Sequence, residues 1–547
     1  MKPISSGSKE NFQKAIMERG FYPEELPPCF EVSGFFDAAK KLNLFRKGKA
    51  FKAYRRKAEI KKEGLELTYY NASKRGFQRR LFSCANPLFY IRAASFFGKE
   101  RGKISSFLRK KGTHYSCSIP QFEVSGHRAI TIKPFWEFDK AKREKLSTFP
   151  YLVKIDTSRF YPSLYTHAIP WAYHGKSKAK SSQDRDLTMN EIDKIIRSAQ
   201  RNQTIGIPVG PDTSRIVSEI IAVAVDAEFR KKVDGNVYGV RLVDDVVFGA
   251  ESEAHGQQIL NAYREALREF ELDINEIKTR IIPSSQDLEP YWVFAIKRDL
   301  GSGNDLVNVL DNIIRTANEQ NDDGIIKFAL RQIDNLKLLN AKWEIIEPYL
   351  MRVTVNFPHC IPYVVKIVVW VSNFEKVDME KWKRVCHLII KTHAPLGHDA
   401  EVTWACWLLK NLTLESKITK KLLSIILQKG SAFPALIAVD LAYSESKAML
   451  NEARKLVTNR LSDHSMRESD WLLSYECERL FGFPFLSQKN LDYPVFQNLL
   501  QYRVQFYSKE IFIDSCQRDK SSTKTALDDF GSLYDEDDFG SLYDDGL

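Results

Sequence analysis

Residues 240–249 read Val-Arg-Leu-Val-Asp-Asp-Val-Val-Phe-Gly, so an acidic pair interrupts an otherwise apolar run. β-branched and aromatic residues on both sides of a short polar pair are typical of two strands joined by a turn. We therefore expect strands over 238–242 and 246–248, with Asp244 and Asp245 at the turn between them.

The sequence around this hairpin predicts a domain of mixed sheet and helix. A second apolar run, residues 152–155, ends at Asp156, which lies 88 residues before Asp244. Between the two, Asp212 is expected to cap an amphipathic helix, and residues 259–270 have the apolar spacing of another helix. The order strand, helices, hairpin, helix is that of an α/β or α+β domain.

The three aspartates have a chemical interpretation as a set. Phosphoryl transfer to a nucleotide uses two divalent ions about 3.5–4 Å apart, and carboxylates on neighbouring strands hold such ions. A single aspartate at a strand end is commonly only a turn or cap residue. The residues around Asp156, Asp244 and Asp245 therefore decide between the two interpretations.

Four segments resemble the motifs of reverse transcriptases, in the order of that family. Residues 154–163 (Lys-Ile-Asp-Thr-Ser-Arg-Phe-Tyr-Pro-Ser) are similar to motif A, and residues 206–214 (Gly-Ile-Pro-Val-Gly-Pro-Asp-Thr-Ser) to motif B. Residues 240–249 resemble motif C, with Leu242 where tyrosine is usual, and residues 272–279 resemble motif D. The resemblance implies an α+β fingers and palm fold.

The resemblance also implies roles at the metal centre and the leaving group. Asp156 and Asp244 would bind two Mg²⁺ or Mn²⁺ ions, with Asp245 as a third carboxylate. Lys278 would contact or protonate the departing pyrophosphate, and its alternative is a solvated lysine at a helix end.

Three further residues are implied at the nucleotide. Tyr161 resembles the steric gate that excludes a ribose 2′-OH, which implies the use of dNTPs. Phe160 competes for that role, because one ring of the pair belongs in the core. Gly210 would let the backbone approach the incoming nucleotide or the templating base, as a residue without Cβ can.

Basic residues upstream are expected to contact phosphates. Arg128 and Lys133 alternate with apolar residues as in a β-ribbon and are predicted to clamp the triphosphate. Residues 45–80 hold thirteen Lys or Arg with interleaved aromatics, a composition suited to nucleic acid. The predicted contacts are Lys49, Lys52, Arg55 and Arg56, and the alternative is the solvated face of a helix.

The chain divides into four predicted regions: an N-terminal and fingers region (1–150), a palm (151–300), a helical-repeat domain (305–515) and a disordered acidic tail (516–547). In the third region, helix-like segments begin near Pro358, His398, Ser431 and Met466. Their spacings of 40, 33 and 35 residues are typical of a HEAT-like array, with an ordinary helical bundle as the alternative.

The tail carries a short acidic repeat. Asp-Asp-Phe-Gly-Ser-Leu-Tyr-Asp-Glu at 528–536 recurs with one change at 537–545. The last twenty residues hold eight acidic and no basic groups, so residues 1–527 carry +19 against +11 for the whole chain. Such an excess of positive charge indicates a polyanionic partner.

A longer string, residues 158–176, together with residues 206–214, resembles the bacterial abortive-infection (Abi) reverse transcriptases of phage defence. That resemblance implies template-independent synthesis from dNTPs, primed by a protein hydroxyl to which the DNA stays attached, in a homo-oligomer (trimer or hexamer). It leaves the priming Tyr, Ser or Thr open. The alternatives are a defence reverse transcriptase that copies a noncoding RNA and an inactive palm that only binds nucleic acid.

The remaining composition points to a cytoplasmic protein, and the Abi resemblance implies a bacterial one. The eight cysteines lack metal-ligand spacing and are expected to be free thiols. The amino terminus has no apolar signal region, and the longest apolar run, residues 361–371, is interrupted by Pro362 and Lys366. We therefore expect no contact with a membrane.

Overall fold

The computed structural model describes residues 2–45, 64–74, 78–112, 114–181, 187–233, 235–301, 305–335, 342–485 and 494–510. The predicted nucleic-acid contacts Lys49, Lys52, Arg55 and Arg56 and the predicted acidic tail lie outside these residues.

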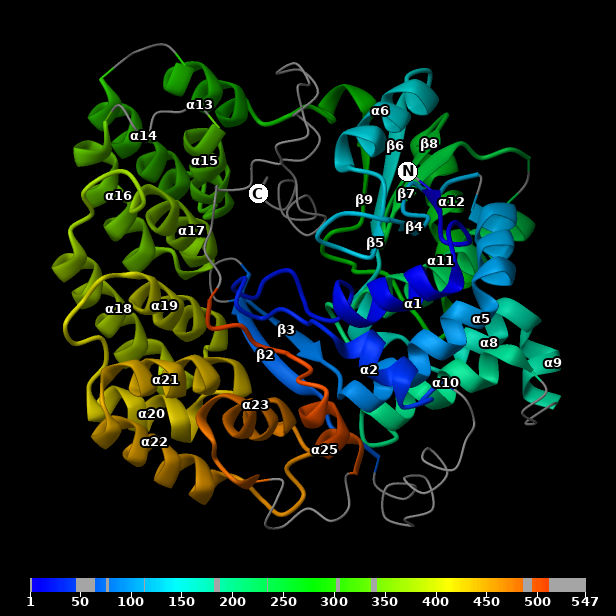
Figure 1. The fold of residues 1–547 in the computed structure, drawn as a ribbon. Coiled ribbons are helices and arrows are strands. Elements are labelled where there is room, and N and C mark those ends of the chain that lie inside the picture. The colour runs from blue at the N-terminus through cyan, green and yellow to red at the C-terminus, as the bar shows by residue number, and fades with distance from the viewer. Residues whose placement is uncertain are drawn as a thin grey trace.

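The chain has an N-terminal lobe, residues 2–283, that mixes helices and strands (Figure 1). Its helices are α1 (Lys9–Glu18), α2 (Phe35–Lys41), α5 (Pro87–Gly112), α6 (Phe135–Leu146), α7 (Phe160–Ser163), α8 (Ala168–His174), α9 (Lys176–Ser181), α10 (Thr188–Ala199), α11 (Asp212–Lys232) and α12 (Glu253–Arg268). Its strands are β1 (Lys2–Pro3), β2 (Thr68–Ser73), β3 (Arg79–Cys84), β4 (Gln121–Phe122), β5 (Ile130–Thr131), β6 (Tyr151–Asp156), β7 (Gly239–Leu242), β8 (Asp245–Ala250) and β9 (Arg280–Pro283).

A four-stranded antiparallel sheet with the order β7-β8-β6-β9 forms the centre of this lobe. Both of its faces are buried, which explains why its strands are almost continuously apolar. Alternate residues such as Val153 and Phe248 belong to the main core, to which α11 and α12 contribute. Leu152 and Val247 point to the opposite face, where they join a smaller cluster with residues of α6.

The helical region follows the sheet after only seven residues, because β9 ends at Pro283 and α13 begins at Tyr291. Its helices are α13 (Tyr291–Gly301), α14 (Leu306–Glu319), α15 (Gly324–Asn335), α16 (Trp343–Asn356), α17 (Ile361–Val371), α18 (Met379–His393), α19 (Asp399–Asn411), α20 (Lys420–Lys429), α21 (Ala432–Glu445), α22 (Lys447–Arg460), α23 (Trp471–Phe481) and α25 (Pro494–Gln501). Short 3-10 turns stand at η1 (Ser284–Gln286), η3 (Pro358–Cys360) and η4 (Ala394–Leu396).

Alternate helices stack in two layers. One layer contains α15, α17, α19, α21 and α23, and the other contains α16, α18, α20 and α22. The four segment starts expected from the sequence correspond to the first layer, at η3, α19, α21 and α23. Figure 1 shows the layers as an arc beside the N-terminal lobe.

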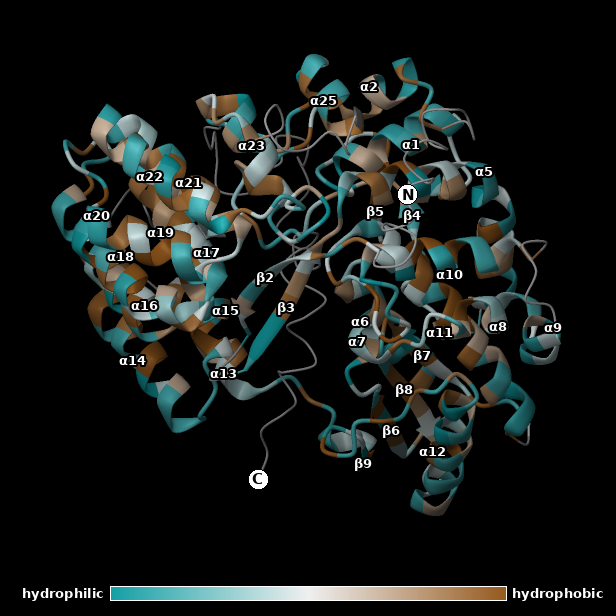
Figure 2. Cartoon of the chain, turned by 90° about the horizontal axis from the view of Figure 1, so that it is seen from below, coloured by the Kyte–Doolittle hydropathy of each residue, from teal (hydrophilic) through white to brown (hydrophobic). Residues whose placement is uncertain are grey.

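The hydrophobic residues explain this layering. Residues 432–442 of α21 are all buried, since α21 has helices on several sides. In Figure 2 hydrophobic residues gather on α10 and between α19 and α21, while α12 is largely hydrophilic along its visible side. Within the described residues, no helix is long and apolar enough to cross a bilayer.

The end of the helical region returns to the N-terminal lobe. The Tyr22 hydroxyl donates to the Phe506 carbonyl at 2.9 Å, and Ser33 and Gln505 exchange backbone hydrogen bonds. α19 packs against β2, and Trp404 in that helix donates its indole N–H to the Glu25 carbonyl at 3.0 Å. Within the described residues, the helical region is therefore joined to the N-terminal lobe at its end and along α19.

The cysteines agree with the expectation of free thiols for the described residues. Seven of them are free and buried, and Cys516 lies outside the described ranges. Burial raises the pKa of thiols such as those of Cys84 and Cys477 well above the ordinary value, which makes them unreactive.

Candidate active site

Two of the predicted carboxylates meet across the central sheet. Asp156 is the last residue of β6 and is paired directly with Asp245, the first residue of β8. Side chains of directly paired residues stand on the same face, with Cβ atoms about 4.5–5.5 Å apart. Asp244 lies in the preceding turn, where its carbonyl accepts a hydrogen bond from Thr157 N at 3.3 Å. The structure thus brings the three aspartates to one end of the sheet.

The turn that presents Asp244 contains a strained residue. Val243 has a φ of 53°, in the left-handed region that β-branched residues rarely adopt, at a cost of about 1–3 kcal/mol. Two side chains hold it there: Ser118 Oγ accepts from Val243 N at 2.9 Å, and the Arg241 guanidinium donates to the Val243 carbonyl at 3.1 Å. We call β7, β8 and this turn the carboxylate hairpin.

Arg241 itself lies in a buried ionic cluster beneath the turn. Its side chain is 1% exposed and donates to Glu219 and Asp226 of α11 at 2.9–3.1 Å. This cluster was not predicted from the sequence. A signal for it exists, because Glu219 and Asp226 are seven residues apart on an apolar helix face, where a buried cation must balance them.

The aspartates repel one another in the absence of a cation. Burial and the charges of Asp244 and Asp156 raise the pKa of Asp245 well above its ordinary value, against the smaller opposing effects of Lys278 and Lys74. Three carboxylates are the donor set that Mg²⁺ and Mn²⁺ prefer, so these residues fit divalent ions.

Motif D delivers Lys278 to the carboxylates. Asn275 N donates to the Asp156 carbonyl at 2.8 Å, which ties the segment after α12 to the end of β6. Lys278 Nζ then lies 4.0 Å from Asp156 Oδ2. The fold thus brings this lysine beside the carboxylates, and its role at the pyrophosphate stays a prediction.

The two rings of motif A occupy different environments. Phe160 is 5% exposed and belongs to the core, whereas Tyr161 is half-buried at its edge. The Tyr161 hydroxyl accepts from Ser218 Oγ at 3.2 Å. Tyr161, and not Phe160, is therefore the ring at the edge of the core, and its role as a steric gate stays a prediction.

The structure explains why glycine stands at position 210, which the sequence did not show. Its φ is 113°, and a Cβ at this position would lie 2.6 Å from Pro23 Cγ. Its carbonyl also accepts from Arg128 at 2.9 Å. Packing against the N-terminal segment therefore requires this glycine, whatever its relation to a nucleotide.

Arg128, the predicted clamp on a triphosphate, is engaged by acidic residues of other segments, and its role as a clamp stays a prediction. It pairs with Asp212 and, at 3.0 Å, with Glu24, and its side chain is 11% exposed. Asp212 also accepts from Ala129 N and Ile130 N at 2.9 Å. The Asp212 carboxylate is thus directed at this segment and does not cap α11, which corrects the expectation of a cap.

Lys133 forms an ion pair with Glu137 at 2.9 Å, one turn along α6. It borders a cavity of about 440 Å³ whose other lining residues, such as Pro3, Ser105 and Cys117, lie around β1 and the end of α5. None of the three aspartates lines this cavity, and the role of Lys133 as a clamp on the triphosphate stays a prediction.

Lys74 stands where Arg128 was expected. It follows β2 at the tip of the β2–β3 hairpin, its N–H donates to the Gln78 carbonyl at 2.9 Å, and its charge acts on Asp245. We call β2, β3 and this tip the basic hairpin. Ser83 N of the hairpin donates to the Val209 carbonyl at 2.9 Å, which joins it to motif B. Alternating residues on both sides of a Lys-Arg-Gly turn at 74–76 were the available sequence signal.

The basic hairpin is held from the helical region. Arg79 donates to both carboxylate oxygens of Glu401 in α19, at 2.5 and 3.0 Å. Asn71 donates its side-chain amide to the Gly397 carbonyl at 2.9 Å and its backbone N–H to Asp399 at 3.0 Å. The position of Lys74 therefore depends on helices more than 300 residues away in the sequence.

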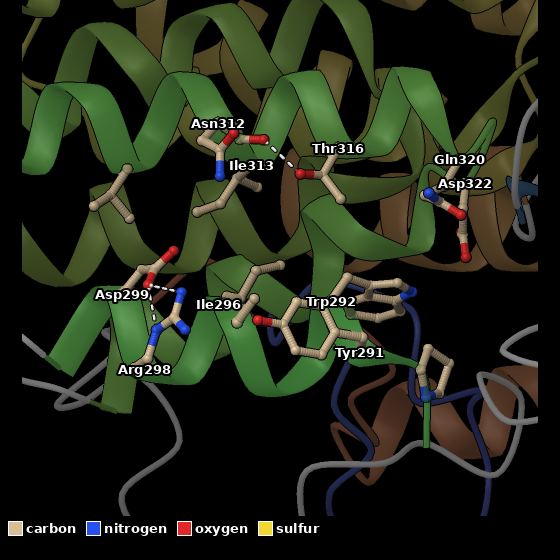
Figure 3. A pocket seen from close by; sticks show the side chains of 13 residues that line it. Tyr291, Trp292, Ile296, Arg298, Asp299, Asn312, Ile313, Thr316, Gln320 and Asp322 are labelled. Carbon is tan, nitrogen blue, oxygen red and sulfur yellow. Dashed lines mark hydrogen bonds and ion pairs between the residues drawn. The ribbon is translucent and has the colours of Figure 1, made fainter. Parts of the chain in front are cut away.

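A separate cavity of about 430 Å³ lies between α13 and α14 (Figure 3). Tyr291, Trp292 and Ile296 line one side, and Asn312 and Thr316 face them from α14. The aspartates are not among its lining residues, so this cavity is distinct from the candidate active site.

Comparison with known proteins agrees with this geometry. Residues 106–289 match the family model of the reverse transcriptase (RNA-dependent DNA polymerase). The chain contains a reverse transcriptase domain. This is the domain of a nucleotidyltransferase, and the fold class, a reverse-transcriptase-like part followed by a helical region, is confirmed.

Solved structures with similarity to the chain include yeast telomerases. Apo telomerase of Candida tropicalis truncated from its C-terminal domain shares 16% identity with a TM-score of 0.27, over 42% of this chain and 52% of that one. Candida albicans telomerase in complex with a fragment of telomeric RNA shares 13% identity with a TM-score of 0.26, over 74% and 66% of the two chains. The chain thus spans about half to two thirds of these proteins, and scores this low carry no functional weight. No curated protein matches the chain.

Proposed function

We propose that the chain is a DNA polymerase of the reverse transcriptase type that adds dNTPs by two-metal nucleotidyl transfer. The observation that carries this proposal is the convergence of Asp156, Asp244 and Asp245, with Lys278 Nζ 4.0 Å from Asp156. Bound Mg²⁺ or Mn²⁺ would neutralise the phosphates and lower the pKa of the attacking hydroxyl.

The residues around the carboxylates then have distinct tasks. The attacking hydroxyl oxygen forms a bond to the α-phosphorus, the bond to pyrophosphate breaks, and the hydroxyl proton passes to solvent. We expect Lys278 to give a proton to the pyrophosphate and Lys74 to offset the charge of the pyrophosphate, which their nearness to the aspartates supports. The ring of Tyr161 would fill the space of a 2′-OH, which favours dNTPs.

We further propose the Abi mode of action: template-independent synthesis primed by a hydroxyl of the protein, in the bacterial cytoplasm and in defence against phage. The direct passage from β9 to α13 supports it. α13 already packs on α14 and α15 as part of the helical region, so no additional thumb stands between the sheet and those helices to grip a duplex. We interpret the two helical layers as HEAT-like and expect a trimer or hexamer.

The test is synthesis by purified protein after treatment with DNase and RNase and removal of both nucleases. Single dNTPs are added with Mg²⁺ or Mn²⁺, and the Asp244→Asn variant is the matched control. We expect DNA that stays attached to the protein during phenol extraction and so leaves the aqueous phase with it. After proteolysis this DNA is expected to migrate as a ladder.

Each of the other possible results contradicts one part of this proposal. Synthesis that needs added RNA contradicts template independence and supports a reverse transcriptase that copies a noncoding RNA. DNA free of protein contradicts protein priming. No synthesis under any of these conditions contradicts the polymerase and leaves a palm that only binds nucleic acid.

A further inference from the structure

Three side chains of the kinds that bind transition metals converge where the helical region meets the basic hairpin. His393 ends α18, His398 precedes α19, and Glu401 lies in the first turn of α19. The two Nδ1 atoms are 2.9 Å apart, and they lie 4.0 and 3.9 Å from Glu401 Oε1. All three ligand atoms fall within 4.8 Å of one another.

These distances are close to those of a tetrahedral zinc site. With Zn–N and Zn–O bonds of about 2.0–2.2 Å, neighbouring ligand atoms stand about 3.3 Å apart. The two imidazole nitrogens would separate by about 0.4 Å and the carboxylate oxygen would approach by about 0.6 Å. Rotations of the side chains supply movements of this size, so the backbone can stay in place.

The backbone between His393 and His398 makes a tight turn that brings the two side chains together. η4 and the left-handed Gly397, with a φ of 66°, reverse the chain, and His398 N donates to the His393 carbonyl at 3.2 Å. Glu401 follows His398 by three residues at the start of α19, so it returns to the same side. The ligands therefore come from one short, ordered segment.

The surroundings of the ligands also suit a cation. His393 and His398 are partly buried, and an imidazole binds a metal in its neutral form. The Glu401 side chain is fully buried, and its carboxylate is oriented by Arg79 through both oxygens. The guanidinium opposes a further positive charge, so we expect weaker binding than at a structural site with anionic ligands alone.

We propose that His393, His398 and Glu401 bind a divalent transition metal of the Zn²⁺ type, with water in the fourth position. Imidazole and carboxylate ligands suit this class of ion, whereas Mg²⁺ prefers oxygen ligands alone. A metal at this position would tie α18 to α19 directly behind the strand that carries Arg79. This proposal rests on the helical region and is independent of the polymerase assignment.

The test uses the full chain with Asp156→Asn, Asp244→Asn and Asp245→Asn, which removes the other predicted metal centre. Co²⁺ is titrated as a spectroscopic probe and then displaced by Zn²⁺. We expect one Co²⁺ per chain with the absorption of a four-coordinate site, and binding at least about tenfold weaker in the His398→Ala variant.

The matched control is His387→Ala, because His387 lies earlier in α18 and contacts the Lys417 carbonyl at 2.8 Å. Equal Co²⁺ affinity of the His398→Ala and His387→Ala variants would overturn the proposal. So would a lack of Co²⁺ absorption in the parent protein.

A second measurement does not depend on the folding of a variant. The X-ray absorption spectrum of the parent protein with one Zn²⁺ is expected to show two imidazole ligands. A spectrum with oxygen or sulfur ligands alone would show that the histidines form only a hydrogen-bonded pair.

Discussion

The carboxylate hairpin and the basic hairpin bring opposite charges to the same site, but they are supported in different ways. The first is held by Arg241 and Ser118, which belong to its own lobe. The second is held by Glu401 and Gly397 of the helical region. The turn with the predicted metal ligands is therefore held by residues of the reverse transcriptase domain, whereas the basic hairpin with Lys74 depends on the helical region.

Removing a ligand from the carboxylate hairpin has the largest expected effect. The Asp244→Asn substitution keeps the side-chain volume and removes the charge that holds a metal ion. We expect synthesis below about one per cent of wild type, which corresponds to more than ~2.7 kcal/mol of barrier. Steady-state dNTP incorporation measures this, with Glu253→Gln on the exposed start of α12 as the control. Activity above that level with a normal melting temperature would show that Asp244 is not a ligand.

Removing Arg241, which supports the carboxylate hairpin, has the next largest expected effect. An Arg241→Met substitution leaves Glu219 and Asp226 buried without their cation, which costs about 3–5 kcal/mol of the free energy of unfolding. Denaturant titration measures the loss. Adding Glu219→Gln and Asp226→Asn removes the stranded charges, so this triple variant is expected to regain part of the stability. If the triple variant is no more stable than Arg241→Met, stranded charge is not the cause.

We expect Tyr161, in α7, to set the choice of sugar. Tyr161 is linked to motif B by its carbonyl, which accepts from Ile207 N at 3.1 Å. We expect Tyr161→Ala to raise the relative use of rNTPs by about 10- to 100-fold, because the ring no longer fills the 2′-OH space. Tyr161→Phe keeps the ring and is expected to retain the preference for dNTPs. Competition between dNTPs and rNTPs measures this ratio, and an unchanged ratio in Tyr161→Ala would refute the gate.

The support of the basic hairpin is expected to have the smallest effect. Asn71→Ala removes one hydrogen bond to Gly397 and one with Arg79, so Lys74 is less firmly placed. We expect the KM for dNTPs to rise about two- to tenfold, the factor that 0.5–1.5 kcal/mol carries, with little change in kcat. Leu81→Thr, exposed on β3 opposite Asn71, is the control. Equal KM values for the two variants would show that the contact with the helical region does not contribute to dNTP binding.

The sequence predicted the parts of the site that lie within local motifs. Strand β6, the carboxylate hairpin and Lys278 stand where the motif spacing placed them, because a buried strand leaves little freedom in register. The regular spacing of apolar segments likewise predicted the helices of one layer.

Contacts between distant segments were not predictable in this way. Arg128 has the alternating neighbours of a ribbon residue, yet its partner Asp212 lies 84 residues away and draws it into the interior. Lys74 was one basic residue among thirteen in its segment, and only the fold shows that its charge lowers the pKa of Asp245. Charge pattern alone does not identify which cation meets the carboxylates.

The closure between residues 22–33 and 505–508 has a consequence for the synthesis of the protein. Phe506 packs against Phe21 and Phe35, and Ser508 N donates to the Cys29 carbonyl at 2.8 Å. A nascent chain emerging from the ribosome leaves these N-terminal aromatics uncovered until residue 506 has been translated. Contacts of such long sequence separation form late. The lobe that carries the candidate active site therefore completes its core only after residues 505–508 have been synthesised.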